Sequence, residues 1–120
     1  MEIWINPACS KCRAATAALD ESGHEYTTRR YLDDPPTVEE LTAVLVRLGL
    51  EPWDIVRTTE TPYAALRALP KDAEHRPQWI DAMVTNPILV QRPIITIDDG
   101  TTAIARDPET LARLLKNLTP

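Results

Sequence analysis

A short stretch near the amino terminus constrains the fold of this chain most, because it places two cysteines between a predicted strand and a predicted helix. The stretch runs Asn6-Pro-Ala-Cys9-Ser-Lys-Cys12-Arg13. The apolar run 1–5 before it is typical of a strand, and the Ala-rich run 14–19 after it predicts a helix that ends at Gly23. Cys9 therefore lies at a strand-to-helix junction, where free N–H groups and the helix dipole favour an anion such as a thiolate. Thiolate chemistry is the leading hypothesis.

The remaining elements predict an α/β chain with a thioredoxin-like architecture. Residues 25–31 are rich in β-formers, so the start of the chain predicts a βαβ unit with parallel strands and a right-handed crossover. Residues 94–97 and 101–104 predict a hairpin around the turn 98–100. Asp107 and Pro108 predict the start of a last helix. The predicted order is β-α-β, a helical insertion, then β-β-α.

The middle of the chain predicts several short helices. Between Pro35 and Pro87 lie seven of the 11 prolines, which interrupt long helices. Thr37 and Glu40 form a capping-box pattern ahead of a helix that ends at Gly49, and shorter helical pieces are expected near 62–69 and 76–85. We therefore expect one domain over residues 1–120, with a core made of 1–33 and 87–120 and a helical insertion at 34–86.

Composition excludes several classes of function. The net charge of −5 and the lack of a basic stripe argue against nucleic-acid binding. No apolar run approaches the roughly 20 residues that cross a bilayer, and no basic segment opens the chain, so a cytoplasmic protein without a signal peptide is expected. Zinc sites use about four ligands, whereas His24 and His75 stand alone in polar turns and are interpreted as solvated loop residues. No metal is predicted.

The spacing C-x-x-C in such a chain predicts redox chemistry rather than a structural disulfide. The alternative is that both cysteines are small buried apolar side chains. Their position beside Pro7, where a strand ends, favours the redox interpretation. Lys11 and Arg13 are expected to lower the pKa of Cys9 further.

Four segments of the chain resemble a known family. They are Asn6-Pro-Ala-Cys9, Arg57 with Thr61-Pro-Tyr63 after it, Asn86-Pro-Ile-Leu-Val-Gln-Arg92-Pro93, and Arg106 before Asp107-Pro108. In this order they are similar to the glutaredoxin-dependent arsenate reductase family (ArsC), within the ArsC/Spx superfamily. The resemblance covers nearly the whole chain, and the run from Pro87 to Ile95 is its most specific part.

This resemblance implies a role for each matching residue. Cys9 matches the catalytic nucleophile, and Arg57, Arg92 and Arg106 match the arginines that bind the oxyanion. Thioredoxin-like topology implies a cis bond at Pro93, which would bring Arg92 to the cysteine; Asn6, Lys11 and Arg13 support the site. The family implies no bound cofactor, glutathione or another low-molecular-weight thiol as reductant, a glutaredoxin-like partner and a monomer. Guanidinium forks would offset the repulsion between a thiolate and the arsenate dianion.

Two positions depart from the family, and they leave alternatives open. The family often has His just before Asn-Pro, where this chain has Ile5, and commonly has Ser where this chain has Cys12. Cys12 is interpreted as a second catalytic thiol, which either resolves the Cys9 adduct or regulates the site. A C-x-x-C is also found in Spx-type regulators as a redox switch on RNA polymerase, and it would suffice for a general disulfide reductase. The complete arginine set favours the arsenate reductase.

Overall fold

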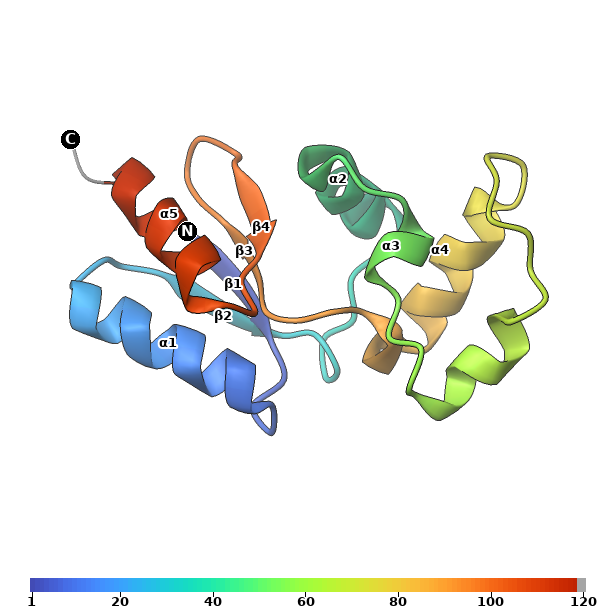
Figure 1. Ribbon diagram of the computed structural model, residues 1–120, viewed down its shortest axis with the longest axis horizontal. Helices are drawn as coiled ribbons and strands as arrows, with labels where there is room; N and C mark the ends of the chain where they lie inside the picture. The colour runs from blue at the N-terminus through green and yellow to red at the C-terminus, as the bar shows by residue number, and fades with distance from the viewer. Residues whose placement is uncertain (119–120) are drawn as a thin grey trace. The chain divides into compact units, whose positions relative to one another are not determined.

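The computed structural model describes the backbone of residues 1–118 and the side chains of residues 1–116. Its elements divide into two compact units, which Figure 1 shows. The first unit consists of residues 1–34 and the chain from Arg92 onward, and the second consists of residues 35–91. Among the described residues, no helix combines the length and the apolar character that a membrane span requires.

The first unit is built on a four-stranded sheet in the order β2-β1-β3-β4. The central strand β1 (Glu2–Ile5) pairs in parallel with β2 (Thr27–Arg30) and antiparallel with β3 (Ile94–Thr96). The edge strand β4 (Thr102–Ile104) pairs antiparallel with β3, so the predicted hairpin is confirmed. In this register Ile3 lies between Thr28 and Ile95.

Two helices of the first unit, α1 (Ser10–Ser22) and α5 (Pro108–Leu118), lie side by side in Figure 1 and contact each other. Apolar side chains from the sheet and from both helices form one core: Ile3, Ala15, Leu19, Ile95, Ile97, Ala105, Leu111 and Leu114. Gly23 ends α1 in the left-handed conformation at φ 76°, which glycine adopts without steric cost. This packing holds α1 against the sheet.

The second unit is helical, as the prolines predicted. It contains α2 (Val38–Leu48), α3 (Pro52–Ile55), the 3₁₀ helix η1 (Thr61–Leu66), α4 (Arg76–Thr85) and the 3₁₀ helix η2 (Pro87–Leu89). The capping box at α2 is confirmed by both of its hydrogen bonds. The Glu40 N–H donates to Thr37 Oγ1 at 3.1 Å, and the Thr37 N–H donates to Glu40 Oε1 at 2.9 Å.

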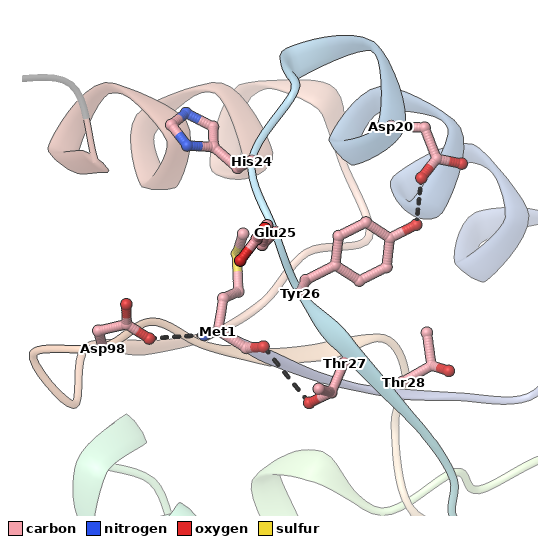
Figure 2. A pocket seen from close by; sticks show the side chains of 8 residues that line it. All are labelled: Met1, Asp20, His24, Glu25, Tyr26, Thr27, Thr28 and Asp98. Atoms are coloured by element: carbon pink, nitrogen blue, oxygen red, sulfur yellow. Dashed lines mark hydrogen bonds and ion pairs between the residues drawn. The ribbon is translucent and has the colours of Figure 1, made fainter.

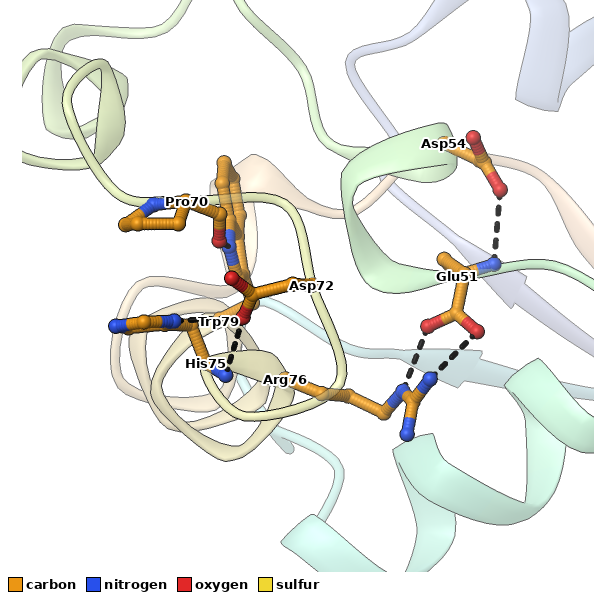
Figure 3. Close-up of polar contacts among 7 residues, drawn as sticks. All are labelled: Glu51, Asp54, Pro70, Asp72, His75, Arg76 and Trp79. Atoms are coloured by element: carbon orange, nitrogen blue, oxygen red, sulfur yellow. Dashed lines mark hydrogen bonds and ion pairs between the residues drawn. The ribbon is translucent and has the colours of Figure 1, made fainter.

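Polar contacts of α4 with the chain before it order the second unit (Figure 3). Arg76 donates from Nε and Nη2 to the Glu51 carboxylate at 2.6 and 2.8 Å. The Trp79 indole N–H donates to the Pro70 carbonyl at 2.9 Å, and the Trp79 ring meets Trp53 edge to face with centroids 6.0 Å apart. Trp79 is fully buried, and the hydrogen bond to Pro70 satisfies its indole N–H.

The boundary after the insertion lies at Gln91, five residues beyond the predicted end at 86. The short helix η2 and an isolated antiparallel bridge between Val56 and Val90 tie residues 87–91 to the helices before them. The Gln91 N–H also donates to the Ile55 carbonyl at 3.0 Å. The order β-α-β, helices, β-β-α is that of a thioredoxin-like α/β fold, as predicted.

Candidate active site

The loop between β1 and α1 positions Cys9 at the start of the helix. The Cys9 N–H donates to the Asn6 carbonyl at 2.9 Å, and the Ala8 N–H donates to Asn6 Oδ1 at 3.0 Å. Asn6 therefore stabilises the turn with both its backbone and its side chain. Cys9 is the N-cap residue, with extended backbone at φ −86° and ψ 125°. Its side chain is partly exposed. The thiol therefore stands where the unpaired N–H groups of the first helical turn converge.

The surroundings of Cys9 favour its thiolate. Burial raises the pKa of the Cys9 thiol, but hydrogen bonds from the Cys12 N–H, the Arg92 guanidinium, the Cys12 thiol and the Lys11 N–H outweigh it and lower the pKa to about 7. About half of Cys9 is then ionised at neutral pH, against a few per cent of an ordinary cysteine.

Cys12 has the opposite character. Its side chain is 1% exposed, and burial raises its pKa to about 11, with the neighbouring Cys9 charge adding to the shift. The Asn6 N–H donates to Cys12 Sγ at 3.4 Å. The alternative interpretation from the sequence, a small buried apolar side chain, thus describes the burial of Cys12 but not of Cys9.

Arg92 is a buried cation beside the Cys9 thiol. It precedes β3 through a cis Arg92–Pro93 bond, as the thioredoxin-like topology implied. Its side chain is 7% exposed, and its Nε and Nη1 atoms are buried without a hydrogen-bond partner in the described part of the chain. Buried N–H groups of a guanidinium are costly to leave unpaired, so these two donors suit an acceptor that the protein itself does not supply.

Tyr31 is the residue of this region that the sequence reasoning missed. It follows β2, is fully buried and contributes a side-chain hydrogen bond to Arg92. Burial lowers the pKa of Arg92, but the contacts with Cys9 and Tyr31 raise it by more than burial lowers it. The guanidinium therefore stays charged. Only its place directly after the second strand could have drawn attention to it.

Arg106 lies next to Arg92. Its Nη1 atom donates to the Arg92 carbonyl at 2.8 Å, and the neighbouring Ala105 N–H donates to the Pro93 carbonyl at 3.0 Å. The residue after β4 is thereby attached to the residue before β3. The first unit thus brings together Cys9, Cys12, Arg92 and Arg106 from three distant parts of the sequence.

Arg57 lies in the second unit. Its Nε atom lies 3.3 Å from Glu60 Oε1, its Nη1 atom donates to Gln91 Oε1 at 3.4 Å, and its N–H donates to the Leu89 carbonyl at 2.7 Å. The side chain is 18% exposed. These contacts use only some of its five N–H donors, and its approach to Cys9 remains a prediction.

The expected effect of the Lys11 and Arg13 side chains on the pKa of Cys9 stays a prediction. The strongest groups that lower the Cys9 pKa are the Cys12 N–H, the Arg92 guanidinium, the Cys12 thiol and the Lys11 N–H. Arg13 donates from Nη1 to the Pro7 carbonyl at 3.3 Å. Both side chains are exposed on α1. The helix N–H groups and the buried Arg92 guanidinium together favour the thiolate.

The two histidines lie away from the cysteines in sequence and differ from each other. His75 lies in the turn before α4, as expected, but it is only partly exposed, and its Nδ1 atom lies 2.6 Å from Asp72 Oδ1 (Figure 3). His24 lines a wide polar hollow of about 810 Å³, near the amino ends of β1 and β2 (Figure 2).

Cys9 follows the carboxyl end of β1, the end at which α/β sheets place their ligand sites. Within residues 1–116 no group of three or more His, Cys, Asp or Glu side chains could hold a metal ion.

Comparisons with known proteins agree on one family. The family model described as the ArsC family matches residues 4–114. A Streptomyces viridochromogenes protein, described as an uncharacterized protein in the glnII region, is 56% identical over 111 residues, covering 91% of this chain and 93% of its own length. The arsenate reductase of Escherichia coli K12 is 34% identical over 113 residues, covering 94% of this chain and 79% of its own length.

A solved structure agrees with these sequence matches. The arsenate reductase from Vibrio cholerae superposes with a TM-score of 0.79 at 33% identity, over 94% of this chain and 97% of its own. The match thus extends over both compact units, and the sequence similarity extends over the cysteine loop and all three arginines. The chain belongs to the ArsC family.

Proposed function

We propose that this protein is a thiol-dependent reductase that converts arsenate to arsenite through a covalent Cys9 adduct. The observation that carries the proposal is the pairing of a low-pKa thiol with a buried guanidinium that has two unpartnered nitrogens. A tetrahedral oxyanion offers acceptors for both N–H groups of Arg92 and places its central atom within reach of the thiolate. The arsenate reductase name of several relatives supports this substrate.

The first step forms the adduct. The Cys9 thiolate attacks arsenic, a sulfur–arsenic bond forms, and one arsenate oxygen leaves as water after taking up protons. The guanidiniums of Arg92, Arg106 and Arg57 offset the repulsion between the thiolate and the arsenate dianion. Phosphate would occupy the same cradle without accepting electrons, so selectivity comes from the reaction.

The second step needs another thiolate. It attacks the Cys9 sulfur, a disulfide forms, the sulfur–arsenic bond breaks, and its electron pair remains on arsenic as arsenite. Because burial raises the pKa of Cys12 to about 11, Cys12 stays protonated at pH 7. This supports an external thiol, such as glutathione, as the attacking group, with a glutaredoxin-like protein to reduce the mixed disulfide. Cys12 then acts as a protonated donor to the Cys9 thiolate.

Turnover of the purified reduced chain tests this function. Arsenite formation is measured with glutathione and glutaredoxin, and sulfate in place of arsenate serves as the blank. We expect arsenate-dependent oxidation of glutathione that Cys9→Ser abolishes and Cys12→Ser largely retains. Turnover that survives in Cys9→Ser, or glutathione oxidation that does not depend on arsenate, contradicts the proposal.

A second candidate, a general disulfide reductase, is favoured by the hydrogen bond between the two thiols. Such an enzyme has no use for a buried cation with free donors beside its nucleophile. Arg92→Lys separates the two functions. If the protein is an arsenate reductase, arsenate turnover decreases in this variant. If it is a general disulfide reductase, reduction of a small disulfide substrate is the activity to measure. Mild peroxide followed by mass spectrometry then tests whether a Cys9–Cys12 disulfide forms.

A further inference from the structure

The backbone of Arg92 is attached to the chain that follows β4. The pairing of β3 with β4 continues past the strands, because the Ala105 N–H donates to the Pro93 carbonyl at 3.0 Å. Pro93 has no N–H to return this bond, so the backbone pairing ends there. The Arg106 side chain then donates from Nη1 to the Arg92 carbonyl at 2.8 Å. These contacts fix the main chain of Arg92 but leave the direction of its side chain open.

Tyr31 lies at the same end of the sheet as Arg92. It directly follows Arg30, which pairs with Ile5 at the carboxyl end of β1. Arg92 precedes β3, which pairs with the other side of β1 in the antiparallel direction. The two residues therefore flank the point where β1 leads into the cysteine loop, and both belong to the first unit.

Tyr31 and Arg92 are both removed from water, Tyr31 completely and Arg92 nearly so. Tyr31 contributes a side-chain hydrogen bond to Arg92, and the Arg92 guanidinium contacts the Cys9 thiol. Because a guanidinium has only donors, the Tyr31 oxygen is the acceptor. A phenol oxygen accepts without carrying a charge, so it orients the guanidinium and leaves its positive charge available to an anion.

Packing alone does not require the Tyr31 hydroxyl group. A phenylalanine ring would fill the same space in the core, and a buried hydroxyl costs free energy unless it is hydrogen-bonded. Arg92 also keeps Nε and Nη1 buried without a partner in the described part of the chain. Two donors meet two oxygens of one anion only when the guanidinium is held in one orientation, and Tyr31 contacts that guanidinium.

We propose that Tyr31 is a positioning residue for Arg92: its hydroxyl oxygen holds the guanidinium beside the Cys9 thiol and directs Nε and Nη1 at the oxyanion. The role toward the oxyanion rests on the proposed function. The role toward Cys9 does not, because that contact exists without a substrate. Tyr31 acts through Arg92 and takes no part in the making or breaking of bonds.

Two phenylalanine variants test the hydroxyl group. Tyr31→Phe keeps the ring and removes the oxygen. Tyr26→Phe is the matched control, because Tyr26 belongs to the same unit and its hydroxyl donates to Asp20 Oδ1, but it lines the hollow near the amino ends of β1 and β2 (Figure 2). The melting temperature of each variant verifies that it is folded.

The first measurement is the midpoint of Cys9 alkylation by iodoacetamide as a function of pH, in a Cys12→Ser background and without any oxyanion. We expect Tyr31→Phe to raise the midpoint by about half a pH unit, because the guanidinium is held less firmly against the thiolate. Tyr26→Phe leaves the midpoint unchanged. In an Arg92→Met background Tyr31→Phe has no further effect, because the group through which it acts is absent.

The second measurement is the protection of Cys9 from iodoacetamide by phosphate, and its concentration dependence gives a dissociation constant. We expect Tyr31→Phe to raise this constant about fivefold, because the two donors of Arg92 are no longer held toward the anion. Tyr26→Phe leaves the constant unchanged.

An unchanged midpoint or an unchanged phosphate affinity in Tyr31→Phe overturns the proposal. An equal shift in Tyr26→Phe, or a shift of the same size in the Arg92→Met background, overturns it as well. If phosphate protection and arsenate turnover are both absent in the original protein while the midpoint pattern holds, the proposed function fails and the hold of Tyr31 on Arg92 stands. If turnover is present but Tyr31→Phe leaves the midpoint unchanged, only the positioning role fails.

Discussion

At the scale of single residues, the two cysteines have become different chemical groups although they are three positions apart. Cys9 has unpaired helix N–H groups and a guanidinium around it, which lower its pKa to about 7. Cys12 points into the protein, where burial raises its pKa to about 11. At neutral pH a large share of the first group is therefore the nucleophilic thiolate, while the second stays protonated.

Alkylation as a function of pH measures this difference. In Cys12→Ser the rate of iodoacetamide reaction at Cys9 should rise with a midpoint near pH 7, the value that its surroundings impose. In Cys9→Ser the remaining thiol should react slowly up to pH 9, because burial still raises its pKa. A faster reaction of Cys12 than of Cys9 at pH 7 in the unmutated protein would reverse their roles.

Arg92→Lys tests the guanidinium beside the thiol. Lysine keeps the charge but has no planar fork, so the variant loses the paired contacts with the oxyanion. We expect kcat/KM for arsenate to fall roughly 100-fold and the Cys9 pKa to rise, since one hydrogen bond to the thiolate is lost. Steady-state kinetics and alkylation profiles provide the two measurements. An unchanged Cys9 pKa would mean that Arg92 does not stabilise the thiolate.

Sequence alone predicts some of these residues and not others, for physical reasons. The place of Cys9 follows from local propensities on either side of the C-x-x-C, whereas an isolated arginine carries no local pattern. Arg92 and Arg106 are predicted from family resemblance, and in the structure Arg106 Nη1 donates to the Arg92 carbonyl. The hydrogen bond between Tyr31 and Arg92 depends on packing between segments that are far apart in sequence, and no local pattern marks it.

At the scale of elements, a helix end with a capping motif is specified by a short sequence pattern and can be predicted from it. The capping box at Thr37, the stop at Gly49 and the N-cap of Asp107 all occur where they were expected. The four-residue α3 and the three-residue η2 were not predicted. Pieces this short present no full hydrophobic period, and a bridge between Val56 and Val90 holds them by contacts distant in sequence.

Thr37→Ala tests the cap of α2. The variant loses the side-chain oxygen that accepts the Glu40 N–H, and we expect the free energy of unfolding to fall by about 1 kcal/mol. Urea denaturation followed by circular dichroism measures it. Thr42→Ala is the matched control: Thr42 is exposed within the same helix and only donates back to the Val38 carbonyl. A loss in Thr42→Ala equal to that in Thr37→Ala contradicts the capping role.

At the scale of the whole molecule, the ionisation of Cys9 links its chemistry to stability. Its pKa is about 7 in the folded protein against an ordinary 9.0, so the folded state releases its proton first as the pH rises. Stability from this group is therefore fully present above pH 9 and is lost as the pH falls through 7. Cys12 acts in the opposite direction, and stability from it decreases as the pH rises from 9 towards 11.

Thermal unfolding under reducing conditions measures the link. We expect the melting temperature of Cys12→Ser, relative to that of the double variant Cys9→Ser/Cys12→Ser, to increase from pH 6 to pH 9. The double variant corrects for all other titrating groups. A difference that stays constant over this range would mean that folding does not perturb the Cys9 thiol.

A test of Arg57 decides whether the second unit contributes to the proposed anion binding. Arg57→Lys should raise KM for arsenate while it leaves the alkylation midpoint of Cys9 unchanged, because the strongest shifts of the Cys9 pKa come from Cys12, Arg92 and Lys11. Arg67→Lys, at an exposed position of the same unit, is the control. If both variants keep the original KM, Arg57 does not contact the substrate.

The distribution of tryptophans gives each unit its own optical probe. Trp4 lies in β1, 4% exposed, with the Arg29 guanidinium 5.5 Å from its ring centroid, and this strand leads into the cysteine loop. The other two tryptophans, Trp53 and Trp79, contact each other edge to face in the helical unit. A protein in which both are replaced by phenylalanine would fluoresce from Trp4 alone. Its emission would then report on the strand beside the nucleophile as arsenate binds, reacts and departs.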